Sequence, residues 1–192
     1  MGVDETRRRI VEATAALHEE VGPADTTITA IAERADVQRL TVYRHFPDEG
    51  ALIDACSSHW RDDHPLPDPS SWSGVSDPRL RLREALDEIY AYFRTGAPML
   101  EQVLRDEDEV AELAEVMEPW WDYMGEVAAG LAAGWGVAAG RQARVRAAVG
   151  HALRFSTWRS LTAEGLAEEE AAELMTALVA GAAGRDFEGD DD

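Results

Sequence analysis

The sequence predicts an all-α protein with a small N-terminal helical unit and a larger C-terminal helical bundle. Ala, Leu, Glu and Arg recur at helical spacing along its 192 residues, and no run of alternating β-branched and aromatic residues is closed by a glycine-containing turn. Hydrophobic residues make up 45% of the chain and charged residues 29%, which is typical of globular proteins and excludes a wholly disordered chain. We expect a three-helix helix-turn-helix domain over residues 1–62, a connecting loop over 63–78, a helical bundle over 79–185 and a disordered acidic tail over 186–192.

The charge and cysteine content limit the classes of partner. Asp and Glu number 38 against 18 basic residues, all of them Arg, so the formal charge is −20. A polyanionic partner must therefore meet a local arginine patch against an unfavourable overall field. The single cysteine, Cys56, cannot form an internal disulfide, and no spacing of metal-ligating residues is evident. No apolar stretch has the length of a membrane span or the pattern of a secretory signal. We expect a cytoplasmic protein with no metal, no cofactor and no membrane partner.

Three helices are expected to form the helix-turn-helix domain, and a fourth helix follows them before the connecting loop. The first is predicted from Asp4 to Val21, because apolar residues recur there on one stripe and Gly22-Pro23 follows. Two short helices are predicted over Ile28–Ala35 and Gln38–His45. Asp48 is placed to cap a fourth helix, which carries Leu52, Ile53, Cys56 and Trp60.

The segment from Thr26 to Leu52 has the spacing of a helix, a tight turn and a second short helix. Thr27 can cap the first helix, and Asp36-Val37 can form the turn. On the second helix, Val42 and Phe46 are separated by four residues and point inward together. The opposite, outward face is a mixed contact surface rather than a solvated run of charges; it contains Leu40, Thr41, Tyr43 and Arg44.

This outward face has the chemistry that a DNA major groove requires. Arginine reaches guanine edges or phosphates, Gln38 can address adenine, and an exposed leucine can contact a thymine methyl. Hydroxyl and imidazole groups can bind phosphates and set the register. The same spacing also fits an ordinary helical hairpin whose outward residues pack on the next domain. The candidate DNA contacts are Thr27, Gln38, Arg39, Leu40, Thr41, Tyr43, Arg44 and His45.

A denser pattern favours the first alternative. The pattern consists of Thr27, Ile28, Ile31, Ala32, Ala35, Val37, Thr41, Tyr43, His45, Phe46 and Pro47. In this order and spacing it resembles the helix-turn-helix of the TetR family of transcriptional regulators. The resemblance covers about forty-five residues, from Ile10 to Asp54. It implies that Gln38–His45 is the recognition helix, that Tyr43 and His45 touch phosphates, and that Arg7–Arg9 approach the DNA backbone.

Two positions depart from the family pattern. The turn position usually held by Gly is Asp36, and the position usually held by a phosphate-contacting Lys is Glu49. Aspartate tolerates the left-handed conformation better than most residues, but it adds a negative charge near DNA. Residues 1–60 contain six Arg and eleven acidic residues, so the DNA-binding unit is itself acidic. We therefore expect few phosphate contacts per subunit, and a stronger dependence on base contacts and dimerisation.

The C-terminal region carries aromatic and methionine side chains at helical spacing. Helices are predicted there over Arg79–Thr95, Ala97–Arg105, Val110–Met117, Pro119–Ala133, Ala138–Glu164 and Glu168–Ala183. Such side chains are more often plain core than a ligand pocket. The family resemblance implies that this half encloses a small, largely apolar effector. The expected lining residues are Tyr90, Phe93, Trp121, Met124, His151, Phe155 and Trp158.

The last two predicted helices also indicate a self-association surface. Helix 138–164 has apolar or small residues on two stripes, which implies two burial partners. A homodimer is required if the operator is a palindrome, because its half-sites repeat at fixed spacing. The resemblance implies a four-helix contact across a two-fold axis. The alternative is an amphipathic helix buried inside a monomer. The residues assigned to the dimer interface are Val149, Leu153, Leu161, Leu174, Leu178 and Gly181.

Taken together, the sequence predicts a homodimeric repressor that binds double-stranded operator DNA and releases it when a small effector binds. Two functions of other classes are the alternatives. An all-α enzyme has little support, because no nucleophile elbow or comparable catalytic frame is present. A helical adaptor would use the face of Leu40, Tyr43 and Arg44 to bind another protein. His59 and His64 lie five residues apart and do not share a helical face, so no metal site is assigned to them.

Overall fold

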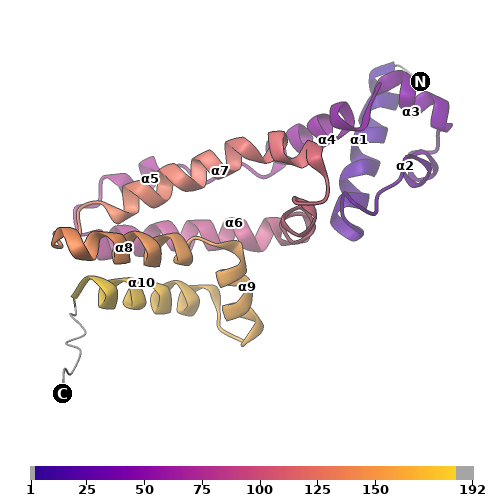
Figure 1. The fold of residues 1–192 in the computed structure, drawn as a ribbon. Coiled ribbons are helices and arrows are strands. Elements are labelled where there is room, and N and C mark those ends of the chain that lie inside the picture. Colours follow the sequence, from indigo (N-terminus) through magenta and orange to yellow (C-terminus); the bar gives the residue numbers. More distant parts are fainter. Residues whose placement is uncertain (1–2, 185–192) are drawn as a thin grey trace. The chain divides into compact units, whose positions relative to one another are not determined.

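The computed structural model describes residues 3–184, which fold entirely into helices and turns without a strand in that range (Figure 1). The prediction of an all-α fold is confirmed. Residue contacts divide the chain into two compact units. The first contains the chain up to Leu66 together with Thr95–Trp120, and the second contains Pro67–Arg94 and the chain from Trp121 onward. The acidic tail expected over residues 186–192 lies outside the described residues.

The first unit begins with helices α1 (Val3–Glu20), α2 (Ile28–Arg34), α3 (Arg39–His45) and α4 (Glu49–Asp63). Both predicted caps are present, since the Thr27 side chain accepts from the backbone N–H of Ala30 at 3.2 Å and Asp48 accepts from that of Ala51 at 2.8 Å. These bonds satisfy amide groups that a helix start otherwise leaves without partners. The core that fixes the four helices contains Ile10, Leu17, Ile31, Val42, Phe46 and Leu52.

The loop between α1 and α2 is held against the end of helix α6 (Pro78–Asp106). Arg105 donates from Nη2 to the carbonyl of Val21 at 3.0 Å, and Asp106 accepts from the backbone N–H of Ala24 at 3.0 Å. Gly22 has φ +94°, and a Cβ there would lie 2.3 Å from Arg105 Nη2 and 2.4 Å from Asp106 Oδ2. The loop can therefore approach these two side chains only because position 22 is glycine.

Helices α6 and α7 (Ala111–Ala132) continue through positions at which the sequence predicted breaks. Two separate helices were expected on either side of Gly96, and two more on either side of Glu118; both predictions are wrong. Pro98 and Pro119 each lie inside one continuous helix. Interior proline costs a helix about 3 kcal/mol. Burial of apolar side chains on both sides of each proline opposes that cost; these include Leu86, Phe93, Leu100, Leu113, Val127 and Leu131.

The structure also splits one helix that was predicted to be continuous. Residues 138–164 form α8 (Ala139–Ala152) and α9 (Phe155–Ala163), because Arg154 adopts an extended conformation between them. Thr157 Oγ1 donates to the carbonyl of His151 at 2.7 Å and so occupies a group that the end of α8 leaves free. The break turns Phe155 and Trp158 into the core of the second unit.

The remaining helices are α5 (Ser70–Ser73), a single turn inside the segment expected to be a loop, and α10 (Glu168–Gly184). Helices α8 and α10 lie side by side, and α9 connects them (Figure 1). Ion pairs join α6 to α10: Arg94 Nε lies 2.8 Å from Glu168, and Arg83 lies 3.8 Å from Glu173. The α8–α10 pair is therefore a fixed part of the second unit.

Candidate nucleic-acid interface

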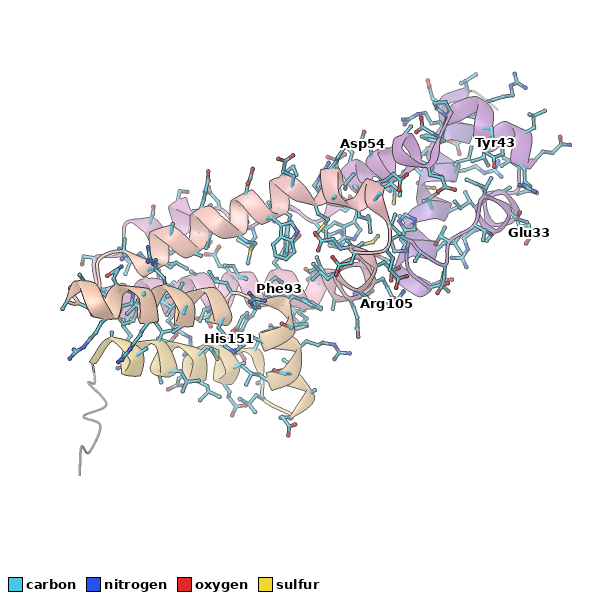
Figure 2. All side chains as sticks on the ribbon, viewed as in Figure 1. Glu33, Tyr43, Asp54, Phe93, Arg105 and His151 are labelled. Atoms are coloured by element: carbon cyan, nitrogen blue, oxygen red, sulfur yellow. The ribbon has the colours of Figure 1, made fainter. Side chains whose placement is uncertain are left out.

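Helix α3 buries one face and presents the other to solvent. Val42 is fully buried and Phe46 is 3% exposed, whereas Leu40 is 68% exposed and Tyr43 46% exposed. Figure 2 shows Tyr43 on α3 at the edge of the first unit. An apolar leucine left this exposed on a rigid helix has no packing role within the described chain, so its presence favours a contact surface.

The other candidate DNA contacts lie on the same side of α3 or close to it. Gln38 is the N-cap of the helix but makes no capping bond with its side chain, so its amide stays available. Arg39 and Arg44 are exposed and form no ion pair with any residue in the described range. Thr41 and His45 are half-buried, and Thr27 is exposed at the start of α2. We name the exposed set Gln38, Arg39, Leu40, Tyr43 and Arg44 the α3 face.

The turn before α3 is formed as the sequence predicts. Asp36 has φ +50°, in the left-handed region that aspartate tolerates better than most residues. The backbone N–H of Val37 donates to the carbonyl of Ala32 at 2.9 Å, which satisfies a carbonyl at the end of α2. The Asp36 side chain is fully exposed and carries its charge beside the α3 face.

Arg7, Arg8 and Arg9 were expected to approach DNA, but the structure gives each of them a partner within the chain. The guanidinium of Arg7 lies 4.8 Å from the centre of the Phe46 ring. Arg8 pairs with Glu5 at 2.8 Å and with Glu12 at 2.5 Å. These acids are three and four residues away along the helix, so the pairs could have been foreseen from spacing alone.

Arg9 has a structural role that sequence reasoning missed. Its Nη2 donates to the carbonyls of Ala35 and Asp36, at the end of α2 and in the turn. Cations at a helix C-terminus are stabilised by the partial negative charge of the unpaired carbonyls. These partners are 26 and 27 residues away in sequence, so no local pattern reveals them. Arg9 thus fixes the turn that orients α3.

A second group that sequence reasoning missed is the buried pair of His18 and Cys56. His18 is 5% exposed, and its Nδ1 lies 3.7 Å from Cys56 Sγ. Burial lowers the pKa of His18 to about 4, an effect that the charge of Asp106 partly opposes. Burial also raises the pKa of the Cys56 thiol to about 12, with a smaller contribution from Glu19. Cys56 is therefore a free thiol enclosed in the first unit.

Four of the seven candidate effector residues come together in the second unit. The ring of Phe93 lies 5.5 Å from that of Phe155 and 6.0 Å from that of Trp158, and Tyr90 is 6.1 Å from Phe93. Tyr90 donates its hydroxyl to the carbonyl of Ala152 at 2.8 Å, and burial raises its pKa. These rings fill the space between them, and Figure 2 shows Phe93 among the packed helices.

The other three candidates are more exposed to solvent than the four residues of that cluster. Trp121 is 47% exposed, His151 is exposed and Met124 is half-buried. Both Trp121 and His151 were assigned from helical spacing. Trp121 lies in α7, which was predicted as two helices, and His151 lies near the end of α8, which was predicted to continue to Glu164. The four clustered aromatic side chains therefore form core, as the spacing alone favoured.

The candidate dimer residues fall into two groups. Val149 and Leu153 are buried within their own subunit, at 0% and 3% exposure, and cannot contact a partner surface. Leu174 is 40% exposed, Leu178 is 56% exposed, and Gly181 is exposed on the same face of α10. Residues 174, 178 and 181 follow the spacing of one helical stripe. The sixth candidate, Leu161 on α9, is half-buried.

Clusters of metal-ligating side chains and membrane-spanning helices are both absent from residues 3–184. In that range, no group of three or more His, Cys, Asp or Glu side chains is arranged to hold a metal ion. None of the helices described there is both long and apolar enough to span a bilayer.

Comparison with known proteins extends the resemblance carried by the helix-turn-helix. Residues 10–56 match the family model of bacterial regulatory proteins of the tetR family. The chain is 28% identical over 102 residues to the HTH-type transcriptional regulator BetI of Paraburkholderia xenovorans and, over the same length, to BetI of Burkholderia thailandensis. Each alignment covers 52% of this chain and 52% of the relative, so the match spans about half the length of these curated relatives.

Solved structures share the fold over almost the whole chain. A TetR-like transcriptional regulator from a Rhodococcus species has a TM-score of 0.62 at 16% identity, with coverage of 94% of this chain and 97% of that one. NalD of Pseudomonas aeruginosa, the secondary repressor of the MexAB-OprM multidrug efflux pump, has a TM-score of 0.59 at 19% identity and covers 97% and 100% of the two chains. Together with the matched family model, these likenesses confirm the resemblance. Over residues 10–56, the chain is therefore similar to the tetR family of bacterial regulatory proteins, and the solved structures show that the similarity in fold extends beyond this segment.

Proposed function

We propose that the protein is a DNA-binding transcriptional regulator that acts as a homodimeric repressor and is released from operator DNA by a small effector. The observation that carries this proposal is the α3 face. It combines two arginines that form no ion pair within residues 3–184, an amide, a phenol and an exposed leucine on a helix whose other side is buried in the core. Arginine and glutamine read guanine and adenine edges in the major groove, and leucine can contact a thymine methyl.

The charge distribution supports a dependence on base contacts. Asp36 precedes α3 in the chain and Glu49 follows it, and both are exposed, while Arg8 and Arg9 are held by partners within the chain. Few arginines remain to neutralise phosphates, so we expect weak binding to random DNA. Specific binding then requires two half-sites and therefore a dimer.

The exposed stripe of α10 supports the homodimer. Leu174, Leu178 and Gly181 lie on one face of α10, beside α8. Apolar side chains at helical spacing on the outside of a folded unit are typical of a protein interface. A second copy of this chain, placed about a two-fold axis, would cover the stripe with its own α8 and α10.

A test of the DNA contact does not require the operator sequence. The full-length protein is used to select duplexes from a random library, and the enriched sequence is measured by fluorescence anisotropy. We expect a palindromic sequence, bound at least tenfold more tightly than random DNA. Tyr43→Ala and Arg44→Ala should each weaken specific binding, the arginine change by about 1–3 kcal/mol, without loss of helicity.

Matched changes in the second unit serve as controls. Leu80→Ala and Arg79→Ala alter exposed side chains of the same types on α6 and should leave the affinity unchanged, whereas Leu40→Ala should lower it. If the selection enriches no sequence, or if Arg44→Ala and Arg79→Ala act alike, the protein is not a sequence-specific DNA binder. Release of the selected duplex by a ligand, followed in the same assay, tests the repressor mechanism.

A further inference from the structure

The second unit contains a cavity that is separate from the buried aromatic cluster. It encloses about 310 Å³ between α5, the start of α6 and the second half of α7. Its apolar walls come from Trp72, Val127 and Leu131, each at most 5% exposed. This volume falls at the lower end of the range for small-molecule sites, which are mostly apolar with a few polar groups.

The polar group that distinguishes this cavity is the guanidinium of Arg81. Its Nη1 donates to the carbonyl of Val75 at 3.2 Å and its Nη2 to the carbonyl of Ala133 at 2.7 Å. Its Nε is buried and has no acceptor within the described part of the chain. None of the described carboxylates forms an ion pair with it. Arg81 therefore places a positive charge, satisfied only by backbone carbonyls, in the wall of an apolar cavity.

Its two backbone bonds give Arg81 a structural role but do not account for all of its donors. A guanidinium has five N–H donors, and a carboxylate takes two of them side by side. A charged donor buried without an acceptor is unfavourable. A ligand carboxylate placed against Arg81 would supply that acceptor, and an apolar body attached to it would contact Trp72 and Leu131.

We propose that this cavity binds a small monocarboxylate with an apolar body. The role of this ligand as the effector rests on the proposed function. Binding of the ligand to the cavity does not require DNA. Glu126, exposed at the edge of the cavity, forms no ion pair with Arg81. The negative charge of Glu126 disfavours an anionic ligand, whereas the positive charge of Arg81 favours one. Removing each charge in turn should therefore have opposite effects on the binding of an anion.

The test uses three probes of matched shape: 4-phenylbutyrate, its neutral amide 4-phenylbutyramide and the cation 4-phenylbutylamine. Binding to the full-length protein is measured by isothermal calorimetry. We expect the carboxylate to bind at least about tenfold more tightly than the amide, and the amine more weakly still. Arg81→Gln should abolish the preference for the acid over the amide, and Glu126→Gln should strengthen binding of the acid.

A second variant keeps the test independent of the structural role of Arg81. A Cβ built at Gly130, which lines the cavity, meets no heavy atom within 4 Å, and the same is true of Gly125 on the same helix. Gly130→Leu should therefore fill the cavity and reduce binding of the acid at least about tenfold. Gly125→Leu is the matched control, because Gly125 lies outside the cavity lining, and it should bind normally.

The proposal is overturned if the acid shows no binding at millimolar concentration, if acid and amide bind equally, if the amine binds best, or if Gly130→Leu and Gly125→Leu behave alike. The selected duplex is measured separately with the same variants. Ligand binding without any specific DNA binding would contradict the proposed function and leave the cavity assignment standing. Specific DNA binding without ligand binding would contradict the cavity assignment and leave the proposed function standing.

Discussion

The carboxylate of Asp106 accepts a hydrogen bond from the backbone N–H of Ala24 at 3.0 Å and so joins residues that are 82 positions apart in sequence. Asp106 is 3% exposed, and Arg105 pairs with it at 2.6 Å while also donating to the carbonyl of Val21. The end of α6 thereby fixes the loop that precedes the helix-turn-helix.

Replacing Asp106 by alanine should destabilise the first unit. The change leaves the amide of Ala24 without its partner and Arg105 without its carboxylate, and loss of such buried, charge-assisted bonds costs about 2–3 kcal/mol. Urea unfolding followed by circular dichroism measures the effect. Asp108→Ala removes an exposed carboxylate two residues away and should change the free energy of unfolding by less than about 0.5 kcal/mol. Equal effects of the two changes would contradict the structural role of Asp106.

The free energy of unfolding should fall as the pH drops from about 6.5 to about 4, because of His18. Burial lowers the pKa of His18 to about 4 in the folded protein, against an ordinary value of 6.5. The unfolded chain therefore binds a proton within this window that the folded chain does not, so acid favours unfolding. The contribution of neutral His18 to the free energy of unfolding is fully present above pH 6.5. At pH 4, the loss of this contribution approaches about 3 kcal/mol.

Two variants isolate this contribution. His18→Gln, which cannot titrate, should unfold with a weaker dependence on pH between 6.5 and 4, even if it is less stable at pH 7. Thr14→Val alters a buried residue of α1 that carries no titratable group, and it should keep the dependence of the unaltered protein. Urea midpoints at several pH values provide the measurement, and an unchanged slope in His18→Gln would exclude His18 as the cause.

Asp106 should add a separate loss of stability at lower pH. Burial raises the pKa of its carboxyl, but hydrogen bonds from Arg105 and Ala24 outweigh burial and hold the pKa below its ordinary value of 3.8. Because the folded-state pKa is depressed, the associated stability is present above pH 3.8 and is lost as the pH falls further. In Asp106→Ala, the dependence of the urea midpoint on pH should therefore be reduced below pH 4.

Cys56 should not react with thiol reagents in the folded protein. Burial raises the pKa of its thiol to about 12, so the reactive thiolate is scarce, and the residue as a whole is 1% exposed. Ser58→Cys places a thiol on the exposed side of the same helix and should be labelled at once by Ellman's reagent. Rapid reaction of the unaltered protein, before urea unfolds it, would contradict burial of Cys56.

The negative charge of Asp36 should weaken DNA binding, while its conformation is tolerated. Asp36→Asn keeps a residue that adopts the left-handed region and removes the charge, so it should bind the selected duplex more tightly at low salt. Asp36→Ala also removes the charge, but it should lose about 1 kcal/mol of stability because alanine is strained at φ +50°. Anisotropy and urea unfolding separate the two effects, and equal stability of the Asn and Ala variants would show that the turn carries no strain.

Local pattern determined the features that depend on a few neighbouring residues. The caps at Thr27 and Asp48 and the inward pair of Val42 and Phe46 follow from spacing within one helical turn. The outward face of α3 follows from the same periodicity, which is why helical spacing alone identifies Leu40 and Tyr43 as outward residues. A dense motif of this kind specifies both its fold and the face that it leaves exposed.

Helix boundaries in the second half could not be predicted in this way. Pro98 and Pro119 sit inside continuous helices because burial on either side opposes the local cost of proline, and α8 ends at Ala152 without proline or glycine at the break. The aromatic residues predicted to form an effector site fill their own core, whereas the cavity beside Arg81 collects residues from α5, α6 and α7.

The sequence by itself determined the all-α class, the helix-turn-helix and its exposed face, because helical periodicity and capping act within a few residues. Tertiary structure alone decided that Arg9 fixes the turn, that Asp106 fixes the loop before α2, and that Arg81 faces an apolar cavity. Each of these depends on groups that are far apart in the chain, and their contacts form only when burial of apolar surface brings those segments together.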